Sequence, residues 1–340
     1  MEKLYDNRKK QRTGIIISLF ILIVITILVS LSTGYANVTI GDVLRILGGN
    51  GTTNENLVVF QFRLPRLILA LMVGVGLAIS GSLLQSLSRN DLADPGILGI
   101  NVGAGIMVVI IYRYFPSLLN SHSYVLPIVA FIGAFAVALL ICWLSINKNK
   151  GFSPLKMILM GIAVTAAGNA FILVTSLRLD RATYVAFSTW NIGNISGATW
   201  AQVQVLIPWL LILLPVIFSK AKTLDALTLG DQSATSLGIN LFKEQLTLLA
   251  LATALAAASV SIAGGIGFVG LIAPHIARRL VGSLHQFSLM TAALIGAILV
   301  MAADTVARVL FSPSEIPVGI AITVIGAPYF LYLLRKANKL

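Results

Sequence analysis

Long apolar segments recur along the whole chain and constrain its fold more than any other feature. A helix needs roughly 20 apolar residues to cross the hydrocarbon of a bilayer, which is about 30 Å thick. Segments of that kind nearly exhaust the 340 residues, of which 57% are hydrophobic and only 11% are charged. Because no polar stretch is long enough to build a core of its own, we expect a single membrane-embedded domain, residues 1–340.

Hydropathy predicts an all-α, polytopic membrane protein with about ten transmembrane helices. The expected spans are residues 14–33, 66–87, 98–115, 124–146, 154–177, 201–219, 244–263, 266–281, 288–308 and 317–336. The eighth of these is short and rich in glycine. The first apolar run is longer than the core of a usual signal peptide, so we expect the first helix to be retained.

Basic residues are divided unevenly between the two sides of this arrangement. With the N-terminus in the cytoplasm, the cytoplasmic segments are the tail 1–13, then 88–97, 147–153, 220–243, 278–287 and the C-terminal tail. All eleven lysines fall in these segments or at the adjoining helix ends, and the seven basic residues elsewhere are all arginine. The positive-inside rule therefore predicts cytoplasmic N- and C-termini for a multi-pass protein of the cell (plasma or inner) membrane.

Several classes of function lack the residues they need. The net charge of +12 is mostly accounted for by topology, and no basic groove with stacking aromatics accompanies it, so we expect no nucleic-acid partner. No Gly-x-x-x-x-Gly-Lys-Ser/Thr loop is present, so ATP would be hydrolysed by a separate subunit. One cysteine and three histidines, none paired with a carboxylate at helical spacing, indicate no metal site, no cofactor and no catalytic group.

A stand-alone, ion-coupled secondary transporter is the alternative to a pathway driven by a partner ATPase. Such carriers usually keep ionisable groups near the bilayer midplane. Asp304 is the only acidic residue well inside an expected span. Its four-residue spacing from Arg308 predicts an ion pair on one face of a helix, near the helix end.

Dispersed glycine- and proline-containing stretches carry the functional interpretation. They are Gly74 to Gly81, the turn Arg89 to Gly99, Gly264 to Arg278, Glu315 to Ile320 and Ile325 to Pro328. Small residues of this kind let neighbouring membrane helices approach closely. Together and in this order, the stretches resemble the FecCD family, the permease subunits of binding-protein-dependent ABC importers for iron(III)-siderophores, haem and cobalamin. The resemblance extends from about Arg63 to Lys336.

The resemblance implies both partners and motif residues. The partners are a second permease subunit in a homo- or heterodimer, a cytoplasmic ABC ATPase dimer and an extracytoplasmic substrate-binding protein, all around a chain embedded in membrane lipid. The expected cargo is an iron(III)-siderophore complex, with haem or cobalamin as alternatives. The pathway and structural motif residues are Gly81, Gln85, Asn90, Asp94, Pro95, Gly99, Gly270, Pro274, His275, Pro317 and Gly319. In one departure, Asp91 stands where the family commonly has proline, which predicts a looser turn.

Arginines at the outer start of the second span form the first candidate partner surface. Cations at a helix N-terminus oppose the helix macrodipole, so another interaction should favour them there. The resemblance implies that Arg63, Arg66 and Arg308 receive carboxylates of the binding protein, and the planar guanidinium suits such recognition. Anchoring to lipid headgroups is the alternative.

The longest cytoplasmic loop, residues 220–243, is the second candidate surface. Its leucine spacing predicts two short helices, with Asp231 capping the second and Gly238 ending it. The resemblance implies a coupling loop that docks in a cleft of the ATPase, and a merely interfacial loop is the alternative. The residues expected in coupling are Leu229, Gly230, Asp231, Ser233, Ala234, Leu237 and Gly238.

Overall fold

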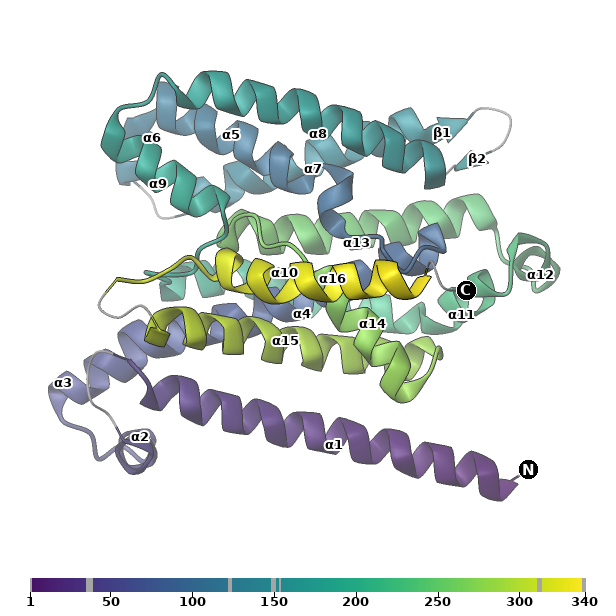
Figure 1. Cartoon of the computed structure of the whole chain (residues 1–340), viewed down its shortest axis with the longest axis horizontal. Coiled ribbons are helices and arrows are strands. Elements are labelled where there is room, and N and C mark those ends of the chain that lie inside the picture. Colours follow the sequence, from purple (N-terminus) through teal and green to yellow (C-terminus); the bar gives the residue numbers. More distant parts are fainter. Residues whose placement is uncertain are drawn as a thin grey trace.

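The chain folds into a bundle of long helices that run side by side (Figure 1). In this computed structural model the described residues are 2–34, 39–121, 124–147, 151–152, 154–310 and 314–337. The long helices are α1 (Glu2–Ser32), α4 (Leu64–Ser88), α5 (Ile100–Tyr114), α7 (Val125–Ser145), α8 (Pro154–Ser176), α10 (Trp200–Ser219), α13 (Leu241–Ala263), α14 (Val269–Val281), α15 (His285–Leu310) and α16 (Val318–Ala337). The expected all-α class is confirmed, because the described strands are only two residues long each.

Shorter elements gather at the two ends of the bundle. They are α2 (Ile40–Leu47), α3 (Thr53–Asn56), the π-helix η1 (Leu57–Arg63), the 3-10 helix η2 (Pro95–Leu98), α6 (Pro116–Ser121), α9 (Arg181–Asn191), α11 (Ala221–Thr228), α12 (Asp231–Ser236) and the strands β1 (Ile146–Asn147) and β2 (Gly151–Phe152). We call the end with α2, α3 and α9 the outer end. The inner end carries α11, α12, the strands, the start of α1 and the end of α16 (Figure 1). Which side of the membrane each end faces stays a prediction.

Eight helices within the described residues are long and apolar enough to cross a membrane. The other two expected spans are shorter, with 15 residues in α5 and 13 in α14, against the roughly 20 that a helical crossing needs. The eighth span was expected from residue 266, but the backbone is not helical until Val269. Gly264 ends the preceding helix with a φ of 73°. The count of ten crossings therefore stays a prediction.

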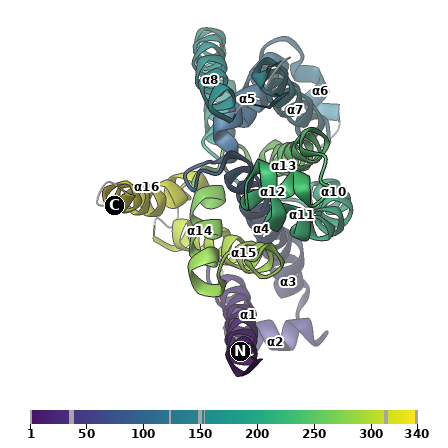
Figure 2. The ribbon, with the colours of Figure 1, turned by 90° about the vertical axis from the view of Figure 1, so that its right-hand side faces the viewer.

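Helix α4 occupies the centre of the bundle, as the view along the helices shows (Figure 2), and packs against α10, α13, α14 and α15. Glycines set how close these neighbours come. A Cβ atom at Gly74 would lie 2.3 Å from the carbonyl oxygen of Gly296 in α15. A Cβ atom at Gly76 would lie 2.2 Å from Oγ of Ser259 in α13. Only glycine permits such backbone approach, which gives membrane helices the dispersion contacts that hold them together.

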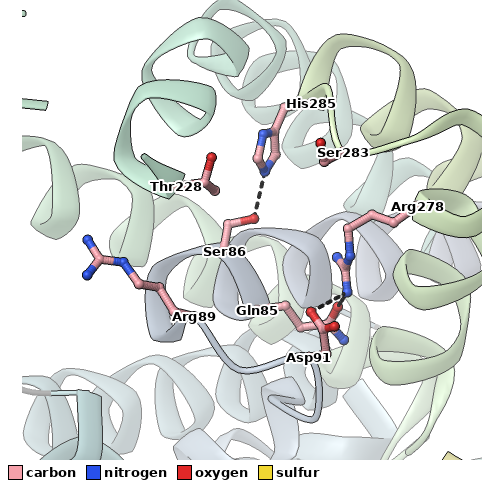
Figure 3. A pocket seen from close by; sticks show the side chains of 8 residues that line it. All are labelled: Gln85, Ser86, Arg89, Asp91, Thr228, Arg278, Ser283 and His285. Carbon is pink, nitrogen blue, oxygen red and sulfur yellow. Dashed lines mark hydrogen bonds and ion pairs between the residues drawn. The ribbon is translucent and has the colours of Figure 1, made fainter. Parts of the chain in front are cut away.

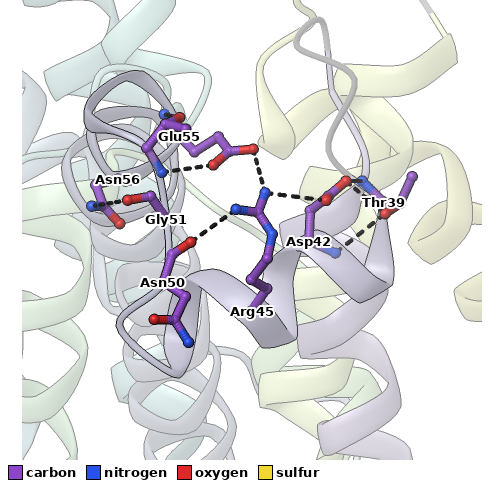
Figure 4. Close-up of polar contacts among 8 residues, drawn as sticks. Thr39, Asp42, Arg45, Asn50, Gly51, Glu55 and Asn56 are labelled. Atoms are coloured by element: carbon purple, nitrogen blue, oxygen red, sulfur yellow. Dashed lines mark hydrogen bonds and ion pairs between the residues drawn. The ribbon is translucent and has the colours of Figure 1, made fainter.

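The outer end carries a compact polar cluster around Arg45 (Figure 4). Its guanidinium donates to the carbonyl oxygen of Asn50 at 2.8 Å and to the carboxylates of Asp42 at 3.3 Å and Glu55 at 2.6 Å. Asp42 also completes a capping box with Thr39, whose hydroxyl holds the pKa of Asp42 below its usual value. These contacts join α2 to the start of α3, so residues 39–56 form an ordered cap next to α4.

The glycine contacts of α4 predict a specific loss of stability. In Gly74→Ala the added methyl group meets the backbone of α15, and overpacking of this kind costs about 1 to 3 kcal/mol. We expect a lower thermal unfolding temperature of the detergent-solubilised protein. Gly14→Ala is the matched control, because nothing lies within 4 Å of that Cβ position. Equal unfolding temperatures for the two variants would contradict the close-packing account.

Candidate functional site

Residues from three separate sequence motifs meet where α4 approaches α14. A Cβ atom at Gly81 would lie 1.9 Å from the carbonyl oxygen of Gly270, and one at Gly270 would lie 2.6 Å from Cδ of Pro95. The side chain of Gln85, which is 2% exposed, donates from Nε2 to the carbonyl oxygen of Gly270 at 3.2 Å. Its Oε1 accepts a hydrogen bond from Arg278. Motifs far apart in the sequence therefore form one junction toward the inner end.

The turn between α4 and α5 is fixed by its own polar side chains. The side chain of Asn90 accepts a hydrogen bond from the backbone N–H of Leu92 at 3.0 Å. Asp94 caps η2 by accepting a hydrogen bond from the N–H of Gly96 at 2.8 Å. Gly99 ends η2 with a φ of 65°, a conformation that favours glycine. Burial raises the pKa of Asp94 to about 6, although the hydrogen bond from Gly96 opposes this shift.

Asp91, the departure from the family pattern, has a clear role in this turn. Its carboxylate forms an ion pair with Arg278 of α14 at 3.0 Å. A proline at this position could not make that contact, because it has no charged side chain. The structure thus links the turn to α14 at the point where sequence analysis predicted a looser turn.

Four further motif residues lie in α14 and at the start of α16: Pro274, His275, Pro317 and Gly319. The ring of His275 lies edge-on to that of Tyr329 in α16, with the centroids 6.0 Å apart. A Cβ atom at Gly319 would lie 1.9 Å from the carbonyl oxygen of Ile192, so this glycine permits the contact between α16 and the end of α9. His275 and Gly319 thus contribute to contacts between helices, whereas the pathway role expected for the four residues stays a prediction.

The arginines expected at the outer surface are engaged within the chain. Arg66 contacts Asp304 through NH2 at 2.8 Å and through Nε at 2.9 Å, and its NH1 contacts Glu315 at 2.7 Å. The side chain of Asp304 is 3% exposed, whereas that of Glu315 is 39% exposed. The ion pair expected between Asp304 and Arg308 is therefore wrong. Asp304 pairs across the helix interface with α4, a contact that helical spacing could not reveal.

Arg63 and Arg308 bind the C-terminal end of α1 instead. Arg63 donates to the carbonyl oxygen of Leu31, and Arg308 donates to the carbonyl oxygen and to Oγ of Ser30, each at 3.0 Å. The last carbonyls of a helix have no partner within it and carry partial negative charge, so cations stabilise them. Arg63 itself is not at a helix N-terminus, because the helical backbone runs without a break from Thr53 through η1 into α4, so the expected conflict with the helix macrodipole is wrong.

The loop at the inner end contains two short helices, α11 and α12, as expected. Gly238 follows α12 with a φ of 82°, which confirms its place at the helix end. Asp231 was expected to cap α12, but Gly230 holds the capping position and Asp231 pairs with Arg89 at the end of α4. Ala234, which belongs to α12, is fully buried.

Two leucines make the exposed apolar surface of this loop. Leu229 is 68% exposed and Leu237 is 65% exposed, while Ser233 lies on the surface beside them. Apolar side chains at an aqueous membrane end are unfavourable unless another surface covers them. The loop therefore presents an exposed leucine pair, Leu229 and Leu237, and its docking to an ATPase stays a prediction.

A hydrogen-bonded chain that sequence analysis missed joins the loop to the bundle. Asp225 of α11 accepts from the backbone N–H of His285 at 2.9 Å, and its Oδ1 lies 2.6 Å from Nδ1 of that imidazole. Nε2 of His285 lies 2.7 Å from Oγ of Ser86 in α4 (Figure 3). These residues are 60 and 199 positions apart, so no local sequence pattern could have indicated the contact.

Ser86 and His285 line a cavity of about 240 Å³ between α4, the inner loop, α14 and the start of α15 (Figure 3). Its lining residues are Gln85, Ser86, Arg89, Asp91, Thr228, Arg278, Ser283 and His285. Both arginines are already paired with carboxylates. Among the described residues no group of three or more His, Cys, Asp or Glu side chains could hold a metal ion.

Comparison with known proteins identifies the family of this chain. The FecCD transport family matches residues 22–336. The chain belongs to the FecCD transport family. The resemblance inferred from the motifs is thus confirmed, and so is the expectation of a multi-pass helical membrane protein.

Individual relatives of this FecCD chain align over nearly its whole length. It is 45% identical to the iron(3+)-hydroxamate import system permease protein FhuG of Bacillus subtilis, over 94% of this chain and 96% of that one. It is 36% identical to the hemin transport system permease protein HmuU of Yersinia pestis, over 92% and 94%. An inward-facing structure assigned to the metal-chelate type of ABC transporter superposes with a TM-score of 0.84 and 30% identity, over 95% of this chain and 99% of that one.

The raised pKa of Asp94 predicts a pH-dependent stability. The folded state holds the Asp94 proton more tightly than the unfolded state, so this contribution is present below about pH 4 and is lost as the pH rises through about 6. Asp94→Asn keeps a cap oxygen and removes the titration. We expect the variant to be more stable than the parent at pH 7.5, by about 1 to 3 kcal/mol, and the difference to vanish near pH 4. Unfolding temperatures across this pH range would contradict the assignment if the difference were constant.

Proposed function

We propose that this FecCD chain is the permease subunit of an ATP-binding-cassette importer and that its cargo is an iron(III)-siderophore complex. The observation that carries the proposal is the 45% identity to a hydroxamate import permease over 94% of the chain. The chain provides the pathway and performs no covalent chemistry. It holds no cofactor in this scheme, and the chelated iron is cargo.

The importer requires three kinds of partner. A second permease subunit completes the pathway, an ATPase dimer binds at the inner end, and a binding protein delivers the chelate at the outer end. The lack of a phosphate-binding loop in the sequence agrees with a separate ATPase. The exposed leucines at positions 229 and 237 supply the apolar centre that a protein interface needs.

ATP-driven closure of the ATPase dimer acts on the pathway through the inner loop. In this mechanism α11 and α12 move with the ATPase, and the contact of Asp225 with His285 carries that motion to α15. The contact of His285 with Ser86 carries it to α4. Packed interfaces shift between discrete arrangements more readily than they deform, so a loop movement can change the packing of whole helices.

The binding protein docks at the outer end, where Arg63, Arg66 and Arg308 gather. Each of these arginines already has a contact within the chain. In this proposal the carboxylates of the binding protein meet guanidinium groups that contacts within the chain already orient. Preorganised groups bind with a smaller loss of conformational entropy.

The observations favour this importer over the alternatives. A secondary carrier needs an acidic group free to bind the coupling ion, but Asp304 is buried in an ion pair with Arg66. Haem is a less favoured cargo, because the hemin permease of Yersinia pestis is 36% identical where the hydroxamate permease is 45% identical. Cobalamin is named by none of the relatives described above.

The proposal is tested by the activity of the partner ATPase. We expect the complex, reconstituted in proteoliposomes, to hydrolyse ATP faster when the binding protein carries a ferric hydroxamate, and less so with haem or cobalamin. ATP hydrolysis by the ATPase alone is the control. No stimulation with any of the three cargoes would contradict the importer assignment.

The exposed leucine pair predicts a variant that assembles poorly with the ATPase. Leu237→Glu places a charge where the ATPase should bury an apolar side chain, and the unpaired charge should weaken assembly by about tenfold or more. We expect less ATPase to copurify with the permease. Leu237→Met, which conserves volume and polarity, should behave like the parent. Normal copurification of the glutamate variant would remove this residue from the interface.

The contacts of His285 with Asp225 and Ser86 predict a coupling defect without loss of assembly. Asp225→Asn replaces a charged hydrogen-bond acceptor with a neutral one, and charged hydrogen bonds are roughly twice as strong. We expect ATP hydrolysis to continue while the uptake of chelate per ATP falls. Asp180→Asn, at the cap of α9 at the other end of the bundle, is the matched control. An unchanged ratio of uptake to hydrolysis would exclude this route of transmission.

A further inference from the structure

The charged side chains around Arg66, called the outer cluster here, carry more positive than negative charge. It contains three arginines, Arg63, Arg66 and Arg308, and two carboxylates, Asp304 and Glu315. Arg308 is close enough to Arg66 and to both carboxylates to interact with them electrostatically, and Arg63 is close enough to repel Arg308. One positive charge is therefore left over at a partly desolvated site, where unbalanced charge is unfavourable.

One donor of this cluster is buried without an acceptor. Nε of Arg308 has no hydrogen-bond partner among the described residues, although NH2 of the same guanidinium binds Ser30. Buried donors are normally paired, and each exception calls for an explanation. A carboxylate brought in from outside would supply the missing negative charge.

The two carboxylates of the cluster differ in how firmly they are held. Asp304 contacts Arg66 through both Nε and NH2 and is almost fully buried, so it fixes the orientation of the guanidinium. Glu315 makes a single contact with NH1, and its side chain is more than one third exposed. Water reaches the carboxylate of Glu315, although not the buried Arg66 side chain, and competes for that single contact. Glu315 can therefore leave Arg66 while Asp304 stays.

We propose that Glu315 occupies, in the free permease, the place that a carboxylate of the extracytoplasmic binding protein takes on docking. The incoming carboxylate displaces Glu315 from NH1 of Arg66, and Asp304 keeps the guanidinium oriented during the exchange. This proposal rests on the proposed function. Glu315 acts as an internal competitor that weakens docking and so favours release of the binding protein after delivery.

Removal of the competing charge tests the proposal. In Glu315→Gln we expect the Kd of the binding protein loaded with ferric hydroxamate to fall by roughly three- to tenfold, since the partly exposed ion pair of Glu315 with Arg66 no longer has to be broken. The Kd is measured on the complete, detergent-solubilised transporter at low and moderate salt. Glu55→Gln is the matched control, because Glu55 also pairs with an arginine at the outer end, Arg45, but does not belong to the outer cluster around Arg66.

A second variant separates this proposal from the docking site itself. Arg308→Lys keeps the charge and removes the planar guanidinium that suits carboxylate recognition, so docking at the cluster predicts a higher Kd. If Arg308→Lys raises the Kd but Glu315→Gln leaves it unchanged or raises it, the docking site stands and the displacement is wrong. If neither variant changes the Kd while both unfold at the temperature of the parent, docking at the cluster is wrong as well.

Discussion

The close approach of neighbouring helices to α4 is the contact on which the rest of the structure depends. Glycines at positions 74, 76 and 81 let α15, α13 and α14 reach the α4 backbone. Between membrane helices, dispersion contacts replace the hydrophobic effect that drives packing in water. A single central helix therefore holds three others in fixed register.

This packing puts α4 in contact with both candidate partner surfaces, through Arg66 in the outer cluster and through Ser86 and Arg89, which lead to the inner loop. Arg66 lies near the outer start of α4, and Ser86 lies near its inner end. Their separation of 20 positions along the helix corresponds to about 30 Å, close to the thickness of the bilayer hydrocarbon. A shift of α4 driven from the inner loop would thus reach the outer cluster directly.

Sequence analysis predicted what depends on local patterns. Hydropathy placed most long helices within a few residues, but α1 begins 12 residues before the expected start and the helix of the second span already begins at Thr53. The left-handed position of Gly238 followed from its place after a short amphipathic segment. The predictions for Asp304 and Asp231 were wrong, because each residue was matched to a neighbour in the sequence while its true partner belongs to α4 or its end. The contact of Asp225 with His285 was missed for the same reason.

The central claim is that this chain moves cargo only with its ATPase and binding protein. It is tested most directly by the uptake of a radiolabelled ferric hydroxamate into proteoliposomes that contain the permease with or without these partners. The account predicts uptake only when both partners and ATP are present, with no dependence on an ion gradient. Uptake by the permease alone, driven by a proton or sodium gradient, would contradict it.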